Sequence, residues 1–205
     1  MAQHEQWRVF CAIDLPEELR ERLMARTVSL RKAVPEAQAS WSRPGNIHLT
    51  VKFVGEIPQT RVVDLSSAAA NAAAGVESFP ISVRESGVFP PHGAPRVLWI
   101  GIEDLEGKLG ELYRTLEEEC AKVGFKKETR HFHPHLTLAR LRNPQHARAL
   151  AAAHQSMEFE PADISVSELL VIRSELSSAG SKYTVVSRHL FGGAVAERSG
   201  NTALD

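Results

Sequence analysis

The feature that most constrains this chain is a short phrase that occurs twice, as HLTV at residues 48–51 and as HLTL at residues 135–138. Each copy lies in apolar, β-favouring sequence, residues 47–54 and 135–141, which predicts two buried strands. Alternate side chains of a strand share a face, so His48 lies beside Thr50 and His135 lies beside Thr137. If the two strands face each other, the cleft between them holds two imidazoles and two neutral hydroxyl donors.

The length and composition of the chain limit what such a cleft can belong to. The 205 residues, 43% of them apolar, can build one substantial core or two small packed lobes. The chain has no apolar run of about 18 residues and no apolar signal core before Trp7, so we expect a soluble, unexported protein without a membrane partner. The net charge of −1 argues against a protein that coats long nucleic acid, but it leaves a small or terminal phosphate as a ligand.

The two cysteines indicate a reducing environment. Cys11 lies in a predicted strand and Cys120 on the apolar face of a predicted helix, so neither offers a disulfide framework. This predicts a cytoplasmic protein. Cys11 is not expected to act as a nucleophile, because it lies in the middle of a strand with no base near it in the sequence.

Hydrophobic periodicity and turn residues predict the order of the elements. Strands are expected at residues 7–13, 47–54, 79–85, 96–102, 135–141, 164–172 and 182–190. Helices are expected from about residue 16 to before Pro35 and at residues 59–74, 105–123 and 143–153. Residues 35–46 and 87–95 are predicted loops, and residues 177–181 a turn.

An internal repeat relates the two halves of the chain. After each motif come a break, an alanine-rich helix and a phenylalanine that leads into an alternating strand, Phe79 in one half and Phe159 in the other. We therefore expect an α+β fold of two pseudo-twofold-related lobes, each an antiparallel-rich sheet with outer helices, with the catalytic cleft between them. Residues 1–190 are expected to form this two-lobed domain, and residues 191–205 a flexible tail.

Two histidines suit one kind of reaction. A displacement that deprotonates a water and protonates a leaving alkoxide needs a base and an acid on opposite sides of the reacting atom. One neutral and one protonated imidazole supply that pair, since an imidazole titrates near about 6.5. A phosphoryl centre fits such a site well, because its attacking and leaving oxygens lie roughly in line. This scheme requires no metal.

The paired His-x-Thr-x phrases resemble those of the two-histidine (2H) phosphoesterases, and the surrounding sequence resembles the bacterial RNA 2′,3′-cyclic phosphodiesterases, also called 2′-5′ RNA ligases. The resemblance rests on five blocks, RVFCAIDLP (8–16), NIHLTVKFVGE (46–56), GVFPPHGAPRVLWIGI (87–102), RHFHPHLTLAR (130–140) and RSELSSAGSKY (173–183). It implies an enzyme without metal or cofactor that opens a terminal 2′,3′-cyclic phosphate on RNA to leave a 2′-phosphate. Weak reverse ligation is a side activity in some members.

The same resemblance implies roles for the site residues. His48 would protonate the departing 3′ oxygen, and His135 would activate water; the sequence itself does not order these roles, because a pseudo-symmetric site is reversible. Thr50 and Thr137 would hydrogen-bond the phosphate. Arg140 would add a charge-assisted contact, and Arg130 is a second candidate cation.

The histidines near the second motif leave an alternative open. His131, His133 and His135 have a spacing that metal ligands use, which would make the protein a metal-dependent phosphoesterase. The copy around His48 lacks neighbouring histidines and carboxylates, so His133 is expected instead to orient a neighbour or the loop. A non-catalytic nucleotide-binding module is a further alternative, although both histidines and both threonines are intact.

The ligand and the partners are predicted only by class. A basic stretch surrounds the second motif and is either a solvated face or a patch that attracts a phosphate; it comprises Lys126, Lys127, Arg130, Arg140 and Arg142. Trp41 and Phe89 could stack on a base, but packing is favoured for both. We expect RNA with a 2′,3′-cyclic phosphate end or a small cyclic nucleotide as the substrate, and a monomer, because no spare amphipathic helix is present.

Overall fold

The computed structural model describes residues 5–177 and 180–192. The strands are β1 (Gln6–Ile13), β2 (Ala39–Trp41), β3 (Leu49–Pro58), β4 (Phe79–Phe89), β5 (Val97–Glu103), β6 (His135–Leu141), β7 (Ala162–Val166), β8 (Glu168–Ser177) and β9 (Gly180–Leu190). The helices are α1 (Glu17–Ala33), α2 (Val62–Ala74), α3 (Lys108–Lys122) and α4 (Ala147–Ser156), with short 3-10 turns η1 (Pro44–Asn46) and η2 (Gln59–Arg61).

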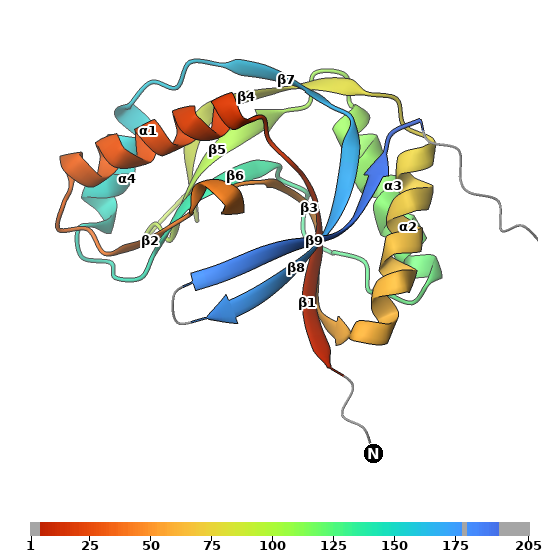
Figure 1. Cartoon of the computed structure of the whole chain (residues 1–205). Coiled ribbons are helices and arrows are strands. Elements are labelled where there is room, and N and C mark those ends of the chain that lie inside the picture. The colour runs from red at the N-terminus through yellow and green to blue at the C-terminus, as the bar shows by residue number, and fades with distance from the viewer. Residues whose placement is uncertain (1–4, 178–179, 193–205) are drawn as a thin grey trace, which may run out of the picture.

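The strands form two antiparallel sheets (Figure 1). One has four strands in the order β3-β1-β8-β9, and the other has five in the order β2-β6-β5-β4-β7. Helices α2 and α3 pack together over the four-stranded sheet, and α1 and α4 pack together over the five-stranded sheet. The predicted α+β architecture of two sheets with outer helices is therefore confirmed.

Each sheet has a helix-covered face and an inner face, which we define as the face turned away from its helices. In β1, Val9, Cys11 and Ile13 point to the helices and belong to the main core. The alternate residues Phe10 and Ala12 point to the inner face, where they form a small separate apolar cluster with two residues of β8. This alternation is what a strand period of two requires.

The lobes are interlocked rather than formed by consecutive halves of the chain. Strand β4 from the first half pairs with β5 and β7, whereas β8 near the C-terminus returns to pair with β1. The order β3-β1-β8-β9 matches the order β6-β5-β4-β7, as a pseudo-twofold relation requires. The expectation that each half builds its own lobe was therefore wrong in its connectivity.

Several element boundaries differ from the prediction. The expected strand 164–172 is two strands in different sheets, β7 and β8, and the expected loop at 35–46 contains the short strand β2. Strand β4 extends to Phe89 through an irregularity at Glu85, whose φ is +63°. Strand β3 begins at Leu49, so His48 lies directly before it.

The remaining expectations concern the cysteines, the membrane and the chain ends. Cys11 and Cys120 are buried free thiols, as predicted. No helix in the described part of the chain is long and apolar enough to cross a membrane. Residues 178–179 of the predicted turn, and 193–205 of the predicted tail, lie outside the described residues.

Candidate active site

The two repeated motifs occupy equivalent positions at the inner faces of the two sheets. Leu49 and Leu136 are fully buried among the core residues, whereas the histidine and threonine of each motif are only half-buried. Strand β3 forms one edge of its sheet, β6 lies beside the edge strand β2 of the other, and β3 and β6 contact each other. The predicted alternation within each motif is thus present, with leucine toward the core.

Both motif strands carry a bulge at the same place. In β6, Thr137 pairs with Trp99 and Ala139 pairs with Leu98, so Leu138 is the extra residue. In β3, Thr50 pairs with Ala12 and Lys52 pairs with Cys11, so Val51 is the extra residue. A bulge reverses which face the following residues occupy.

The bulge decides where Arg140 points. Strict alternation from Leu136 would place Arg140 on the helix-covered face, but the extra residue returns it to the face of His135 and Thr137. Arg140 is exposed there, and its side chain has no hydrogen-bond or ion-pair partner among the described residues. Its positive charge also contributes to the lowered pKa of His135.

A backbone carbonyl and two aromatic rings hold His135. Its Nδ1 lies 2.7 Å from the carbonyl oxygen of His133, so Nδ1 carries the proton and Nε2 is left as an acceptor. The ring centroids of Phe89 and Trp99 lie 5.0 Å and 6.2 Å from that of His135. Burial is the main cause of a lowered pKa for His135.

The environment of His48 is similar. Its ring stacks on Phe10 at 4.7 Å between centroids, and the edge of Tyr183 lies 5.2 Å away. The imidazole also hydrogen-bonds to the backbone of Asn46, two residues earlier, just as His135 does to His133. Burial lowers the pKa of His48 to about 4. A cavity of about 380 Å³ opens beside this ring, between β8–β9, η1 and the start of α1.

Each half of this site therefore presents a hydrogen-bonded imidazole, a hydroxyl and an aromatic wall. Comparison with known proteins places the arrangement in a family. The model of the family described as LigT like Phosphoesterase matches residues 13–99 and again residues 100–183. The chain belongs to this family.

Two relatives align with most of this LigT-like phosphoesterase chain. The RNA 2′,3′-cyclic phosphodiesterase of Methanothermobacter thermautotrophicus is 36% identical over 178 residues, which are 86% of this chain and 95% of that protein. The protein of the same name from Thermotoga maritima is 29% identical over 180 residues, 87% of this chain and 92% of that protein.

Two solved structures share the fold of the LigT-like phosphoesterase. TT0787 of Thermus thermophilus superposes with a TM-score of 0.75 at 28% identity, covering 91% of this chain and 98% of that one. E. coli LigT complexed with 3′-AMP superposes with a TM-score of 0.71 at 26% identity, covering 92% and 100%.

The other predicted side chains of this LigT-like phosphoesterase lie in different settings. Arg130 is 83% exposed, and its guanidinium binds the carboxylate of Glu128. The structure therefore gives Arg130 a carboxylate partner, and a phosphate contact from Arg130 stays a prediction.

The histidine cluster near the second motif does not gather into a ligand set. Within residues 5–177 and 180–192, no group of three or more His, Cys, Asp or Glu side chains is arranged to hold a metal ion. His133 contributes its carbonyl oxygen to His135, and its ring lies edge-on to Phe89 and Trp99. This is the orienting role that the sequence predicted for it.

The thiols stand apart from this chemistry. Burial is the main cause of a raised pKa for both Cys11 and Cys120, and the pKa of Cys120 rises to about 11. A thiol with so high a pKa holds its proton at neutral pH, so neither cysteine is an activated nucleophile.

Sequence reasoning missed the aromatic walls and one buried ion pair. Phe10, Tyr183 and Trp99 come from strands far from the motifs, and the only sequence indication was their place in the family blocks. Lys52, which the bulge in β3 turns to the helix-covered face, donates to the carboxylate of Glu117 at 2.7 Å; both side chains are less than a tenth exposed.

Proposed function

We propose that this LigT-like phosphoesterase hydrolyses 2′,3′-cyclic phosphate ends of RNA to 2′-phosphomonoesters by paired-histidine acid–base catalysis. The two relatives described above are named RNA 2′,3′-cyclic phosphodiesterase, and they align with this chain over most of their length. Among the solved relatives, E. coli LigT is known in complexes with 3′-AMP and with phosphate. The proposal needs no second subunit, because one chain carries both histidines.

One observation carries the proposal. Each motif histidine has one nitrogen hydrogen-bonded to the backbone two residues earlier, which fixes the ring and leaves its other nitrogen for proton transfer. Two such rings lie at the inner faces of two sheets, each beside a hydroxyl. This arrangement suits an in-line displacement at phosphorus.

The proposed steps follow from these positions. Nε2 of His135 accepts a proton from water as the water oxygen bonds to phosphorus. The bond from phosphorus to the 3′ oxygen breaks, and His48 delivers its proton to that oxygen. Thr50 and Thr137 donate hydrogen bonds to the non-bridging oxygens, and Arg140 offsets their charge. The product keeps the phosphate on the 2′ oxygen.

The lowered pKa values fit an acid that charges when substrate arrives. Burial disfavours the imidazolium in the empty site, whereas an adjacent phosphate anion favours it. Binding of the cyclic phosphate therefore raises the pKa of the histidine that serves as the acid, so proton uptake accompanies binding.

The test is the hydrolysis of 2′,3′-cyclic AMP in the presence and absence of EDTA. We expect the same rate in both and 2′-AMP as the product. Production of 3′-AMP would show that the 2′ oxygen is the leaving group instead of the 3′ oxygen. A rate abolished by EDTA and restored by a divalent ion would show a metal-dependent enzyme. Tight binding without turnover would instead indicate a nucleotide-binding module.

A further inference from the structure

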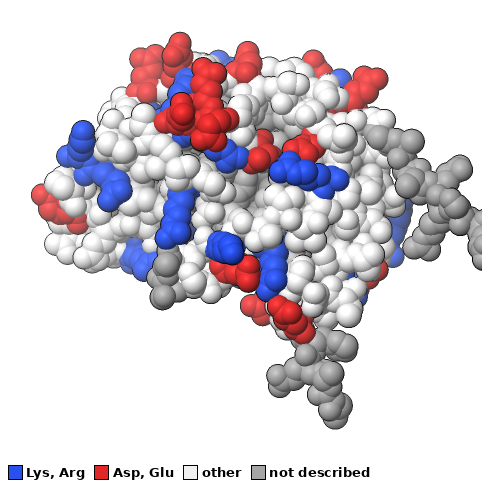
Figure 2. All heavy atoms as spheres, viewed as in Figure 1, with Lys and Arg blue, Asp and Glu red and all other residues white. Residues whose placement is uncertain are grey.

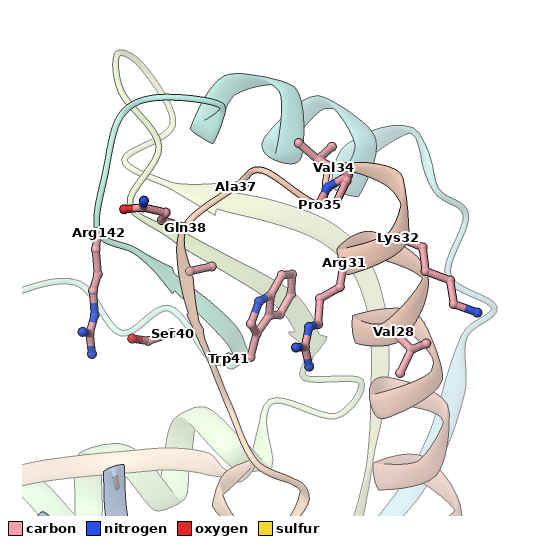
Figure 3. Close-up of a pocket in the computed structure, with 11 residues that line it drawn as sticks. Val28, Arg31, Lys32, Val34, Pro35, Ala37, Gln38, Ser40, Trp41 and Arg142 are labelled. Atoms are coloured by element: carbon pink, nitrogen blue, oxygen red, sulfur yellow. The ribbon is translucent and has the colours of Figure 1, made fainter. Parts of the chain in front are cut away.

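A second hollow, lined by residues other than those of the proposed site, is shown in Figure 3. It has a volume of about 760 Å³ and lies between the last turns of α1, the segment that follows α1, and the edge strand β2. Trp41 points from β2 toward α1, and Arg31 reaches from α1 toward the indole. We call this hollow the α1–β2 groove.

The α1–β2 groove is basic. Arg31, Lys32 and Arg142 line it, and none of its lining residues is acidic. All three side chains are exposed, and none has a hydrogen-bond or ion-pair partner within the described residues. Figure 2 shows acidic side chains gathered over the upper part of α1, whereas basic side chains lie lower and, with acidic ones beside them, toward its far end.

Most other arginines of the chain are committed to partners. Arg20 and Arg26 anchor α1 through buried hydrogen bonds to backbone carbonyls, and Arg61 and Arg173 bind carboxylates. Three cations without a partner in the described part of the chain line the α1–β2 groove, where Arg31 points toward Trp41 while Lys32 and Arg142 point away from it (Figure 3), and they need a separate explanation.

The groove is continuous with the proposed catalytic face. Strand β2 pairs with β6, and Ser40 of the groove lies directly opposite Arg140. Arg142 follows two residues later. It comes directly after the last residue of β6, and at about 3.3 Å per residue its Cα lies at most roughly 23 Å from that of His135. A chain of several nucleotides spans that separation more fully than a mononucleotide does.

We propose that the α1–β2 groove binds the single-stranded RNA that leads to the cyclic phosphate end. Arg31, Lys32 and Arg142 contact internucleotide phosphates, and a base stacks on Trp41. Phosphates supply the charge that three unpaired cations match, and an indole stacks on any base without regard to sequence. This inference rests on the proposed function, since it takes an RNA end as the substrate.

A simpler explanation accounts for only part of the groove. Arg31 and Lys32 lie in the last turn of α1, where cations interact favourably with the helix dipole. That effect does not place Arg142 and Trp41, which come from other elements, in the same hollow.

The experiment compares two substrates, 2′,3′-cyclic AMP and a single-stranded oligoribonucleotide of about ten nucleotides that ends in a 2′,3′-cyclic phosphate. The variants are Arg31→Glu, Arg142→Glu and the double variant. Arg114→Glu is the matched control, because Arg114 is an exposed arginine on α3, over the other sheet. Trp41→Ala and Trp41→Phe test stacking separately, and urea unfolding checks that each variant is folded.

We expect the double reversal to lower kcat/KM for the oligonucleotide at least tenfold, with the value for cyclic AMP and both values for Arg114→Glu within twofold of wild type. The slope of log kcat/KM against log salt concentration should become shallower by about 1.4 for two lost phosphate contacts. Trp41→Phe should keep the preference for the oligonucleotide, and Trp41→Ala should weaken it.

The outcomes separate this inference from the proposed function. Equal losses of kcat/KM on both substrates, or no loss on either, would overturn the α1–β2 groove as an RNA site. Hydrolysis by wild type would still support the proposed function in that case. Failure of wild type to open either substrate would overturn both. If the cations only stabilise the end of α1, the charge reversals would change the stability of the protein and leave its preference for the oligonucleotide intact.

Discussion

The two imidazoles of this protein are held by the same three kinds of contact. A backbone hydrogen bond fixes one nitrogen, an aromatic ring covers the imidazole, and burial keeps it neutral. For His48 the ring is Phe10, and for His135 it is Phe89. Burial lowers the pKa of both imidazoles, and this has a measurable effect on pH dependence.

The first prediction is that kcat/KM for 2′,3′-cyclic AMP is bell-shaped with its maximum below pH 6.5. This profile reports the free enzyme, in which burial lowers the pKa of His48 to about 4 and also lowers that of His135. The maximum falls midway between the two values, whichever ring is the acid. The profile of kcat should peak at higher pH, because bound phosphate raises the pKa. A kcat/KM maximum above pH 7 would contradict this account.

The second prediction concerns the buried ion pair. Lys52→Met leaves the carboxylate of Glu117 buried with only the backbone N–H of Glu128 to bind it, so we expect the free energy of unfolding to fall by about 3–5 kcal/mol. Urea denaturation at pH 7 measures the loss. Lys122→Met, which removes an exposed lysine from its ion pair with Glu119, is the control and should cost much less. Equal effects of the two substitutions would refute the role given to burial.

Individual residues also show where sequence reasoning ends. The motif pattern predicted that leucine faces the core and that histidine and threonine share the other face, which the structure has. Strict alternation could not place Arg140 or Lys52, because each follows a bulge that no local residue pattern announces. A bulge depends on the register with the neighbouring strand, and that neighbour is far away in the sequence.

Strands β4 and β5 support His135 through one close contact between elements. The indole of Trp99 lies close against Gly87, and a Cβ at position 87 would come within 2.0 Å of that ring. Trp99 in turn lies against His133 and His135. Only glycine at this position lets the two strands bring the indole against His133 and His135.

The third prediction follows from that contact. Gly87→Ala should displace Trp99, lower the free energy of unfolding by about 1–3 kcal/mol through overpacking, and lower kcat about tenfold or more because His135 loses its support. Urea unfolding and turnover of cyclic AMP measure the two effects. Gly75→Ala is the control, since a Cβ there meets nothing within 4 Å. Unchanged turnover in Gly87→Ala would show that the indole does not position the imidazole.

At the level of helices and strands, periodic segments were predicted well and short ones were not. The apolar spacing of residues 105–123 predicted α3, which spans Lys108–Lys122. The helix ends just before Gly124, and Gly124 itself has a left-handed backbone conformation. Strand β2 has only three residues, and it exists because β6 supplies its hydrogen-bond partners. The division between β7 and β8 occurs at Ser167, where no glycine or proline marks it.

Across the whole molecule, the exchange of strands ties the two lobes together. β4 belongs to the sheet of the second motif, and β8 completes the sheet of the first. The repeat in the sequence predicted two equivalent lobes but not this exchange, because a repeat shows which segments correspond and not which ones pair.

The fourth prediction is that neither half of the chain folds alone. A fragment of residues 1–95 keeps β1, β3 and β4, but β1 loses β8, and β4 loses both β5 and β7. We expect this fragment to lack a cooperative unfolding transition by circular dichroism and to show no dispersed amide spectrum. A fragment that unfolds cooperatively would mean that the exchange is not required for either lobe.

The account as a whole depends on His48 and His135 acting in one reaction from opposite lobes. The most direct measurement is kcat for 2′,3′-cyclic phosphate opening by His48→Ala, His135→Ala and the double variant, with urea unfolding to show that each remains folded. We predict that each single variant loses about 10²–10⁴-fold and that the double variant loses little more, because the two groups serve a single step. A folded single variant with near-normal turnover would contradict the account.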